Sequence, residues 1–410
     1  MSGQHFPTGR QAHGSPPRAI VLILCVIIVA AAWRASYWYR VARRKPDVTA
    51  RIPYIKWTKS FGDGQSFATS PVLANDGSLY LASVRGNVYS LYPSSVVRWE
   101  YHLREFIAGG LLQDAEENIY FTTLTEVLSV TASGRKRWET TCSEARMWQD
   151  DQRGTFDGNV LYTECGKAFC ALNKDKGSQI WTRPALDSES APVVLKEGVL
   201  VFVSESRLVA VDRDGKTLWT WGNSQLESQV DTPIAVASDE TLYAGSRLDQ
   251  NFVALDAHGA LKWSFNAKDQ GFRSSPVIAS DGTIYVITFE DLLYALTSDG
   301  AEKWRFQLPK AVNGEQHVAP VLGSDGTIYL LVEQRLIALS PERRLLWALP
   351  LGGTFGGSPA LANDGTLYVA TLEGGLYAVQ TESHGLMQSA WPRYQHDSSN
   401  SGRALGRSNK

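Results

Sequence analysis

A short phrase of apolar and aromatic residues returns eight times along this chain of 410 residues. Each copy is marked by an apolar residue that precedes a tyrosine in most copies, namely Leu79, Ile119, Val160, Leu200, Leu242, Ile284, Ile328 and Leu367. Successive copies are 39 to 44 residues apart. A tryptophan recurs at a similar interval, at Trp99, Trp138, Trp181, Trp219, Trp263, Trp304 and Trp347. A repeat of this length predicts one array of similar units rather than the two or three domains that the chain length alone would indicate.

The copy at residues 275–306, SPVIASDGTIYVITFEDLLYALTSDGAEKWRF, shows what one unit is. Its residues are β-branched and aromatic and lack a helical stripe, which predicts strands. The expected strands lie at 275–278, 283–288, 292–296 and 303–306. Asp281-Gly282 and Asp299-Gly300 are dipeptides typical of tight turns between strands. The unit is therefore expected to be a four-stranded antiparallel sheet, as in one blade of a β-propeller.

The copies predict eight blades, but only seven are followed in the ordinary way by a tryptophan strand. The last unit, 358–379, runs instead into a polar stretch. A suitable strand lies at 54–61, near the start of the chain, and contains Trp57. We expect this strand to pair antiparallel with the strand around Leu376 to Val379 and to close the ring. The predicted fold class is all-β: an eight-bladed propeller over residues 54–391, preceded by one N-terminal transmembrane helix.

The pattern SPV…DGT(I/L)Y…LYAL…G…W resembles the quinoprotein-type repeat of pyrroloquinoline-quinone (PQQ) alcohol dehydrogenases. It is also similar to the propeller lipoproteins of the bacterial outer-membrane barrel-assembly machinery. A second motif, Trp391 to Asp397 with Asn400 and Gly402-Arg403, resembles a WP…HD…N.GR pattern that flanks such propellers. A WD40 propeller is disfavoured because no blade ends in Trp-Asp. The resemblance implies a bacterial protein of this superfamily, without implying that a quinone is bound.

The resemblance to PQQ dehydrogenases would imply a calcium-bound quinone, an aspartate base and a vicinal disulfide. The sequence has no Cys-Cys pair and no Cys-x-x-Cys-His motif for a covalent haem. Aspartates such as Asp281 and Asp364 are explained by turn chemistry, and the seven histidines show no metal-ligand spacing. We therefore expect no catalytic residue, no cofactor and no metal. Cys165 and Cys170 flank a predicted turn, where they either form a cross-strand disulfide or pack as small apolar side chains.

One face of the propeller is the candidate site. The loops that lead into the first strand of a blade repeat an aromatic residue, at Phe67, Phe106, Phe272 and Phe355. Arg273 follows one of them, and the turns on the same face carry charges such as Arg247 and Glu290. An aromatic ring with a polar surround suits a protein surface. The alternative is that the phenylalanines plug the joints between blades.

The N-terminus predicts a membrane anchor. Residues 1–18 are polar, and an apolar run from Ala19 to Trp33 extends through an aromatic belt to Tyr39. A signal-peptidase site at Ala30-Ala31-Ala32 is the alternative to this anchor over 19–39. A basic linker is expected at 40–53, and a polar tail at 392–410.

Charge is divided unequally along the chain. Residues 1–51 hold eight Lys/Arg and one acid, against 32 basic and 41 acidic residues in the remainder. The acidic remainder argues against nucleic-acid binding. Positive charges after the apolar run favour a cytoplasmic propeller, whereas the resemblance favours the periplasm, which we expect.

Two classes of function follow from these observations. The first is a bacterial inner-membrane protein whose monomeric propeller binds protein partners as a non-catalytic scaffold in cell-envelope assembly. The second is a quinone- or metal-dependent oxidoreductase that uses the central channel. A cluster of carboxylates and amides at the channel mouth would favour the second class.

Overall fold

The computed structural model of the protein describes residues 53–403, with gaps at 63, 108, 143–153, 167, 185–189, 223–228, 269–270 and 310–317. The expected polar segment 1–18, the anchor 19–39 and the linker up to residue 52 lie outside the described residues. Within the described part of the chain, no helix is long and apolar enough to cross a membrane.

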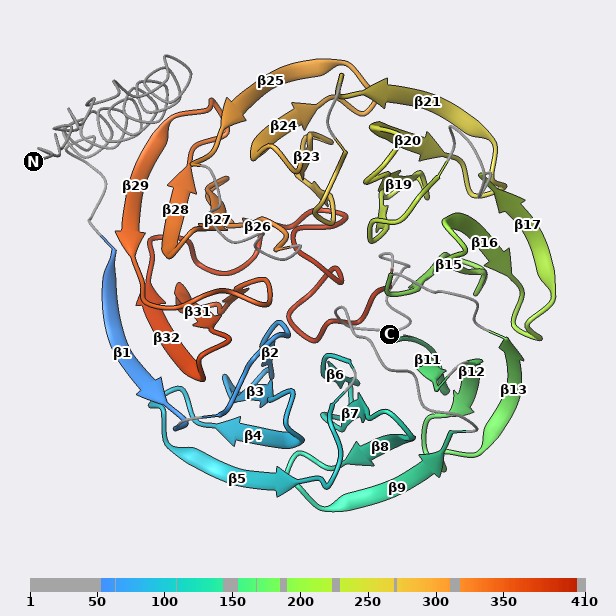
Figure 1. The fold of residues 1–410 in the computed structure, drawn as a ribbon, viewed down its shortest axis with the longest axis vertical. Helices are drawn as coiled ribbons and strands as arrows, with labels where there is room; N and C mark the ends of the chain where they lie inside the picture. The colour runs from blue at the N-terminus through green and yellow to red at the C-terminus, as the bar shows by residue number, and fades with distance from the viewer. Residues whose placement is uncertain are drawn as a thin grey trace, which may run out of the picture. The chain divides into compact units, whose positions relative to one another are not determined.

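The described residues form eight four-stranded antiparallel sheets, and the predicted eight-bladed propeller is confirmed. Figure 1 shows the sheets as blades of a ring, each with its first strand innermost and its fourth on the rim. Blades 1 to 4 are β2 (Val72–Leu73), β3 (Leu79–Ala82), β4 (Asn87–Leu91), β5 (Val97–His102); β6 (Leu112–Gln113), β7 (Ile119–Thr122), β8 (Glu126–Val130), β9 (Lys136–Thr141); β10 (Gly154–Asp157), β11 (Val160–Cys165), β12 (Ala168–Asn173), β13 (Gln179–Pro184); and β14 (Val193–Val194), β15 (Leu200–Ser204), β16 (Arg207–Val211), β17 (Thr217–Trp221). Blades 5 to 8 are β18 (Ala235–Val236), β19 (Leu242–Gly245), β20 (Asn251–Leu255), β21 (Leu261–Asn266); β22 (Val277–Ile278), β23 (Ile284–Ile287), β24 (Leu292–Leu296), β25 (Glu302–Gln307); β26 (Val321–Leu322), β27 (Ile328–Val332), β28 (Arg335–Leu339), β29 (Leu345–Pro350); and β30 (Ala360–Leu361), β31 (Thr366–Ala370), β32 (Gly375–Gln380) with β1 (Tyr54–Ser60).

The first and last strands of the chain close the ring, as the sequence predicts. β1 pairs antiparallel with β32, from Tyr54 opposite Gln380 to Ser60 opposite Gly375. In Figure 1 the blue β1 lies on the rim beside the red β32. Blade 8 is therefore assembled from both ends of the chain, and β1 covers the edge of β32 that would otherwise be unpaired.

The burial pattern explains the composition of the repeat. The second and third strands of each blade are almost wholly buried, because a neighbouring blade covers each of their faces. The fourth strands alternate between partly buried and exposed side chains, as in β21 and β25. The tryptophan of a fourth strand lies on the partly buried side.

These tryptophans join neighbouring blades, as the sequence predicts. In blade 5, the Trp263 indole Nε1 donates to the Ser298 carbonyl of blade 6 at 2.9 Å. Gly300 of the same turn has a φ of +88°, and a Cβ there would come within 2.7 Å of the Trp263 ring. The same turn glycine packs on the preceding tryptophan at Gly134, Gly177, Gly215 and Gly259. Glycine thus provides both the left-handed backbone and the close approach to the ring.

A further segment, residues 382–403, crosses one end of the ring and is called the strap here. In Figure 1 it is the red chain inside the ring. Amides of the innermost strands donate to its carbonyls at 2.7–3.2 Å, from Leu73 to Ser398, Gln113 to Ser399, Val194 to Gly402, Ile278 to Trp391 and Leu322 to Pro392. Each donor is the second residue of its strand. Strap residues Trp391, Arg393 and Asn400 have no exposed surface. As far as Arg403, the segment expected to be a polar tail is therefore part of the packed propeller.

Candidate partner-binding face

The two ends of the ring carry different connections, because the strands of a blade alternate in direction. One end carries the loops into the innermost strands and the turns between second and third strands; it is called the lead-in face here. The strap lies at the other end, where Leu386 pairs with Gly323 and the Ser324 amide donates to the Gly385 carbonyl, both at the turn between β26 and β27. The strap thus covers the end opposite the lead-in face.

Three of the four phenylalanines expected on the lead-in face are buried. Phe67 and Phe272 have no exposed surface, and Phe355 is 1% exposed. The Phe272 ring lies 5.3 Å from the ring of Phe252 in blade 5 and 6.4 Å from that of Tyr294 in blade 6, centroid to centroid. These phenylalanines therefore pack in the joints between blades, the second of the two roles expected for them.

Phe106 differs from the other three, with 56% of its surface exposed. Phe67 and Phe272 each stand five residues before the first residue of an innermost strand, and the corresponding residue in blade 2 is Ile107, which is 3% exposed. Aligning Phe106 with the other three is therefore wrong by one residue. The reason is that Leu111 replaces the proline that marks the register of the other loops.

Arg273 is also buried, at 8% exposure. Its Nη2 lies 2.7 Å from Asp291 Oδ1, and the Asp291 side chain is only 2% exposed. This ion pair joins the loop that leads into blade 6 to the turn between β23 and β24. Breaking a buried pair leaves one charge uncompensated and typically costs about 3–5 kcal/mol. Arg273 therefore holds the shape of the face.

Two exposed apolar side chains that the sequence analysis did not single out lie on neighbouring blades. Leu248, in the turn of blade 5 between β19 and β20, is 74% exposed, and Phe289, in the equivalent turn of blade 6, is 47% exposed. Gly271 lies between the two turns: it accepts the Phe289 amide at 3.0 Å, and a Cβ on it would lie 1.7 Å from the Arg247 carbonyl oxygen. The signal in the sequence is an apolar residue beside charged ones: Leu248 stands between Arg247 and Asp249, and Phe289 stands before Glu290.

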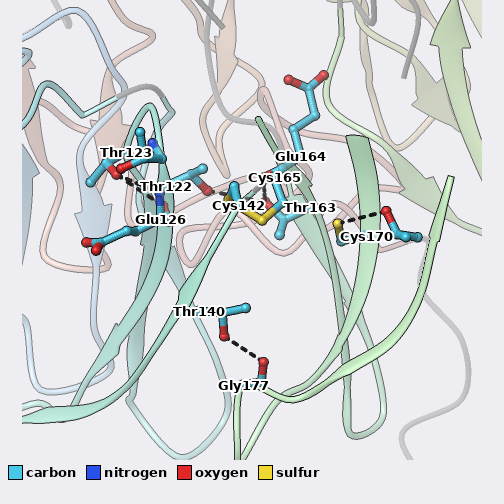
Figure 2. The surroundings of a disulfide bond; sticks show 12 residues. Thr122, Thr123, Glu126, Thr140, Cys142, Thr163, Glu164, Cys165, Cys170 and Gly177 are labelled. Atoms are coloured by element: carbon cyan, nitrogen blue, oxygen red, sulfur yellow. Dashed lines mark hydrogen bonds between the residues drawn. A yellow bond between two sulfur atoms is a disulfide. The ribbon is translucent and has the colours of Figure 1, made fainter. Parts of the chain in front are cut away.

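A disulfide lies at the same face, and it does not join Cys165 to Cys170, which was one of the two alternatives for these cysteines. Cys165, at the end of β11, is bonded to Cys142, directly after β9, so the bond links blades 2 and 3. Figure 2 shows Cys170 apart from this bond. Its sulfur lies 3.5 Å from Thr182 Oγ1. Cys170 is buried and packs as a small apolar side chain, and this burial raises the pKa of its thiol. The sequence did not indicate Cys142 because it belongs to another blade.

The described residues contain no group of three or more His, Cys, Asp or Glu side chains that could hold a metal ion. The turn aspartates have structural partners. Asp281 Oδ1 accepts the Thr283 amide at 2.9 Å, and its Oδ2 lies 3.1 Å from Lys303 Nζ of the fourth strand. Asp239 with Lys262 and Asp364 with Lys56 repeat this arrangement. These carboxylates lie in the turns between the first and second strands, at the strap end of the ring.

The repeat and the fold define a quinoprotein-type β-propeller. The sequence profile of one family, described as outer membrane protein assembly factor BamB, matches residues 124–265 and 248–344, together more than half of the chain. The chain belongs to this family. No curated protein sequence matches the chain.

Solved structures share the fold. BamB from Moraxella catarrhalis has a TM-score of 0.66 at 15% identity, over 80% of this chain and all of that one. Virginiamycin B lyase from Staphylococcus aureus has a TM-score of 0.52 at 12% identity, over 79% and 98%. The WD40 propeller domain of Doa1 has a TM-score of 0.52 at 14% identity, over 81% and 97%. At these identities the likeness concerns the fold alone, and this fold serves both assembly factors and enzymes.

Proposed function

We propose that the protein is a non-catalytic scaffold of the bacterial cell envelope, tethered to the inner membrane by residues 19–39, whose propeller binds a protein partner. Membership of the family described as an outer membrane protein assembly factor supports a role in envelope assembly. The lead-in face is proposed as the binding face. The observation that carries this choice is the exposed pair Leu248 and Phe289, at the end of the ring opposite the strap.

The pair has the properties of an interface centre. Interfaces depend on a few apolar or aromatic anchors that become buried on binding, surrounded by polar residues. Leu248 and Phe289 lie on turns of neighbouring blades, and charged residues adjoin them in the sequence, namely Arg247, Asp249 and Glu290. Phe106, in the loop into blade 2, offers a second exposed anchor on the same face.

The disulfide supports the periplasmic side for the propeller. Disulfides persist in oxidising compartments such as the periplasm and are rare in the cytosol. Cys142 and Cys165 in protein purified from cells without reductant should resist alkylation until a reductant is added. If both react at once, the propeller is in a reducing compartment and the proposed location is wrong.

A photo-crosslinking experiment tests the binding face. A photoreactive phenylalanine analogue is placed at position 248 or 289 of the full chain in living cells. Position 261 is the matched control, because Leu261 lies on the rim of blade 5 and is 51% exposed. Discrete adducts with an envelope protein are expected at 248 and 289 and not at 261.

A substitution completes this test. Phe289→Asp should weaken co-purification of the cross-linked partner by roughly 30-fold, the effect of losing about 2 kcal/mol at an interface anchor. Leu261→Asp should leave co-purification unchanged. Equal adducts at all three positions, or a Phe289→Asp variant that binds normally, would contradict the proposed face.

A further inference from the structure

Blade 8 differs from the other blades in one connection. In blades 1 to 7 a turn joins the third strand to the fourth. In blade 8 the third strand, β32, continues into the strap, and the fourth strand, β1, comes from the other end of the chain. The position that this turn occupies in the other blades therefore has no turn in blade 8.

In seven blades this turn has a fixed partner, the tryptophan of the preceding blade. The indole Nε1 donates to a turn carbonyl at 2.7–3.0 Å, in the pairs Trp57–Pro93, Trp99–Ala132, Trp138–Lys174, Trp181–Arg213, Trp219–Ala257, Trp263–Ser298 and Trp304–Pro341. Two residues after the carbonyl in most of these turns stands a residue with positive φ, such as Gly134, Gly215, Gly300 or Ser95. In five of the seven turns a glycine packs on the indole ring.

Trp347 of blade 7 is the eighth tryptophan, and it faces the missing turn. Its ring contacts Tyr329 of its own blade at 5.8 Å between centroids. Among the described residues its indole N–H has no acceptor. A cavity of about 470 Å³ lies beside it, between blades 7 and 8, and is lined by Pro53, Tyr54, Trp347, Gln380, Thr381, Glu382 and His384. This cavity is called the seam slot here.

We propose that the seam slot binds a glycine-containing β-turn of another protein, which takes the place of the missing turn of blade 8. The occupant supplies a backbone carbonyl to Trp347 Nε1 and packs its glycine on the indole ring. Its chemistry is given by turns of this chain such as Thr297-Ser298-Asp299-Gly300, in which the first side chain caps the turn by accepting the Ala301 amide at 2.9 Å. A turn of the type Asp/Thr-x-Asp-Gly is the expected ligand.

The sequence of the adjoining linker does not supply the glycine found in five of the seven turns. The linker at 40–53 contains no glycine, and the nearest glycine before it is Gly14. At the five glycine-containing turns a Cβ would lie 2.5–2.9 Å from the ring, whereas Ser95 and Arg343 take this position in the other two turns. The turns of a second copy already pack on the tryptophans of their own ring.

The slot is tested by nuclear magnetic resonance of the full chain in detergent, with ¹⁵N-labelled indoles. The Trp347 signal is assigned by its loss in Trp347→Phe. A cyclic peptide carrying the sequence of residues 297–301 is added, and a peptide with valine in place of the glycine is the control. We expect a saturable shift of the Trp347 N–H signal with the first peptide, none with the second, and no shift of the Trp304 signal.

Two outcomes would overturn the proposal. One is a Trp347 signal that is unmoved at millimolar peptide or moves equally with the valine control. The other is an indole N–H that is already protected from solvent exchange and becomes exposed when residues 46–52 are replaced by a Gly/Ser linker, since the chain would then fill its own slot.

Stability provides a second, independent measurement. Trp304→Phe loses a hydrogen bond to the next blade, whereas Trp347→Phe loses none within the described residues. Trp347→Phe should therefore shift the denaturation midpoint less than Trp304→Phe, and equal shifts would contradict an open slot. Leu248→Asp, at the lead-in face, should leave the peptide effect unchanged, so that failure of the proposed partner face is distinguished from failure of the slot.

Discussion

Seven of the eight blade tryptophans are used at two points, the indole N–H and the ring face. Trp263 donates to Ser298 of the next blade, its ring lies 5.7 Å from Tyr243 of its own blade, and Gly300 packs on it. One side chain thus holds together two strands of blade 5 and a turn of blade 6. The repeat retains tryptophan at this position because a smaller apolar residue would fill less of the joint and lack the donor.

Trp263→Ala should destabilise the propeller by about 3–5 kcal/mol, since it removes a large ring from a packed joint. Trp263→Phe should cost less, because most of the packing remains and one hydrogen bond of about 1 kcal/mol is lost. Denaturant midpoints of the purified variants measure both effects. An unchanged midpoint for Trp263→Ala would show that the tryptophan does not hold the joint.

The turn aspartates make a second prediction at the scale of residues. Burial raises the pKa of Asp281, but the hydrogen bonds from Thr283 and Lys303 outweigh it, so the pKa lies below its ordinary value. Asp239 and Asp364 are lowered in the same way. A lowered folded-state pKa stabilises the protein above the unfolded value near 3.9, and this stability is lost as pH falls through the folded value.

The denaturant midpoint should therefore fall steeply below about pH 4. Asp281→Asn should lower the midpoint at pH 6 and should differ less from the parent at pH 3, because part of the stability from the ionised carboxylate is lost below the unfolded-state pKa. Lys303→Met tests the partner and should behave in the same direction. A difference between Asp281→Asn and the parent that is equal at both pH values would contradict the prediction.

At the scale of elements, β1 is the strand on which closure depends. It pairs with β32 over its whole length, and Trp57 of β1 bonds to Pro93 of blade 1. Lys56 contributes to the rim by bonding to Thr366 Oγ1 at 2.9 Å. β1 therefore completes the sheet of blade 8 and also links this blade to blade 1.

Deletion of residues 1–62 should destabilise the whole propeller, because it exposes the edge of β32 and removes Trp57 from the joint with blade 1. The matched control is deletion of residues 1–52, which leaves β1 intact and should preserve the propeller. Thermal melting of the two deletion variants compares them directly. Identical melting of both would show that closure by β1 is not required.

At the scale of the whole molecule, the sequence predicted the ring but not what lies inside it. The number of blades follows from the repeat of 39 to 44 residues. The β1–β32 pairing follows because the last unit lacks a tryptophan strand of its own. The strap was missed because it bonds through backbone groups, as between Ile278 and Trp391, which its polar side chains do not reveal. The alignment of Phe106 with the other phenylalanines was wrong because its loop lacks the proline that marks the register. The partner of Cys165 was not predicted because it lies on another blade. The exposed pair Leu248 and Phe289 was not predicted because its two turns are 41 residues apart in the sequence and belong to different blades.

The whole-molecule prediction concerns cofactors. We expect the purified protein to bind neither PQQ nor calcium tightly, since a buried quinone needs several convergent polar partners and each unpaired polar group costs about 1–3 kcal/mol. Calorimetric titration with both ligands at micromolar protein is the measurement. Stoichiometric binding with a submicromolar constant would restore the oxidoreductase alternative.

The closure of blade 8 also determines when this protein can fold. During synthesis β1 emerges early, and its partner β32 follows more than 300 residues later. The strap, which bonds to blades 1, 2, 4, 6 and 7, is made later still. Contacts this distant along the chain form slowly, so the ring cannot close before nearly the whole chain has been made. Until the last strand arrives, β1 is an unpaired edge in need of protection, and an export route or a chaperone that delays folding is therefore suited to this architecture.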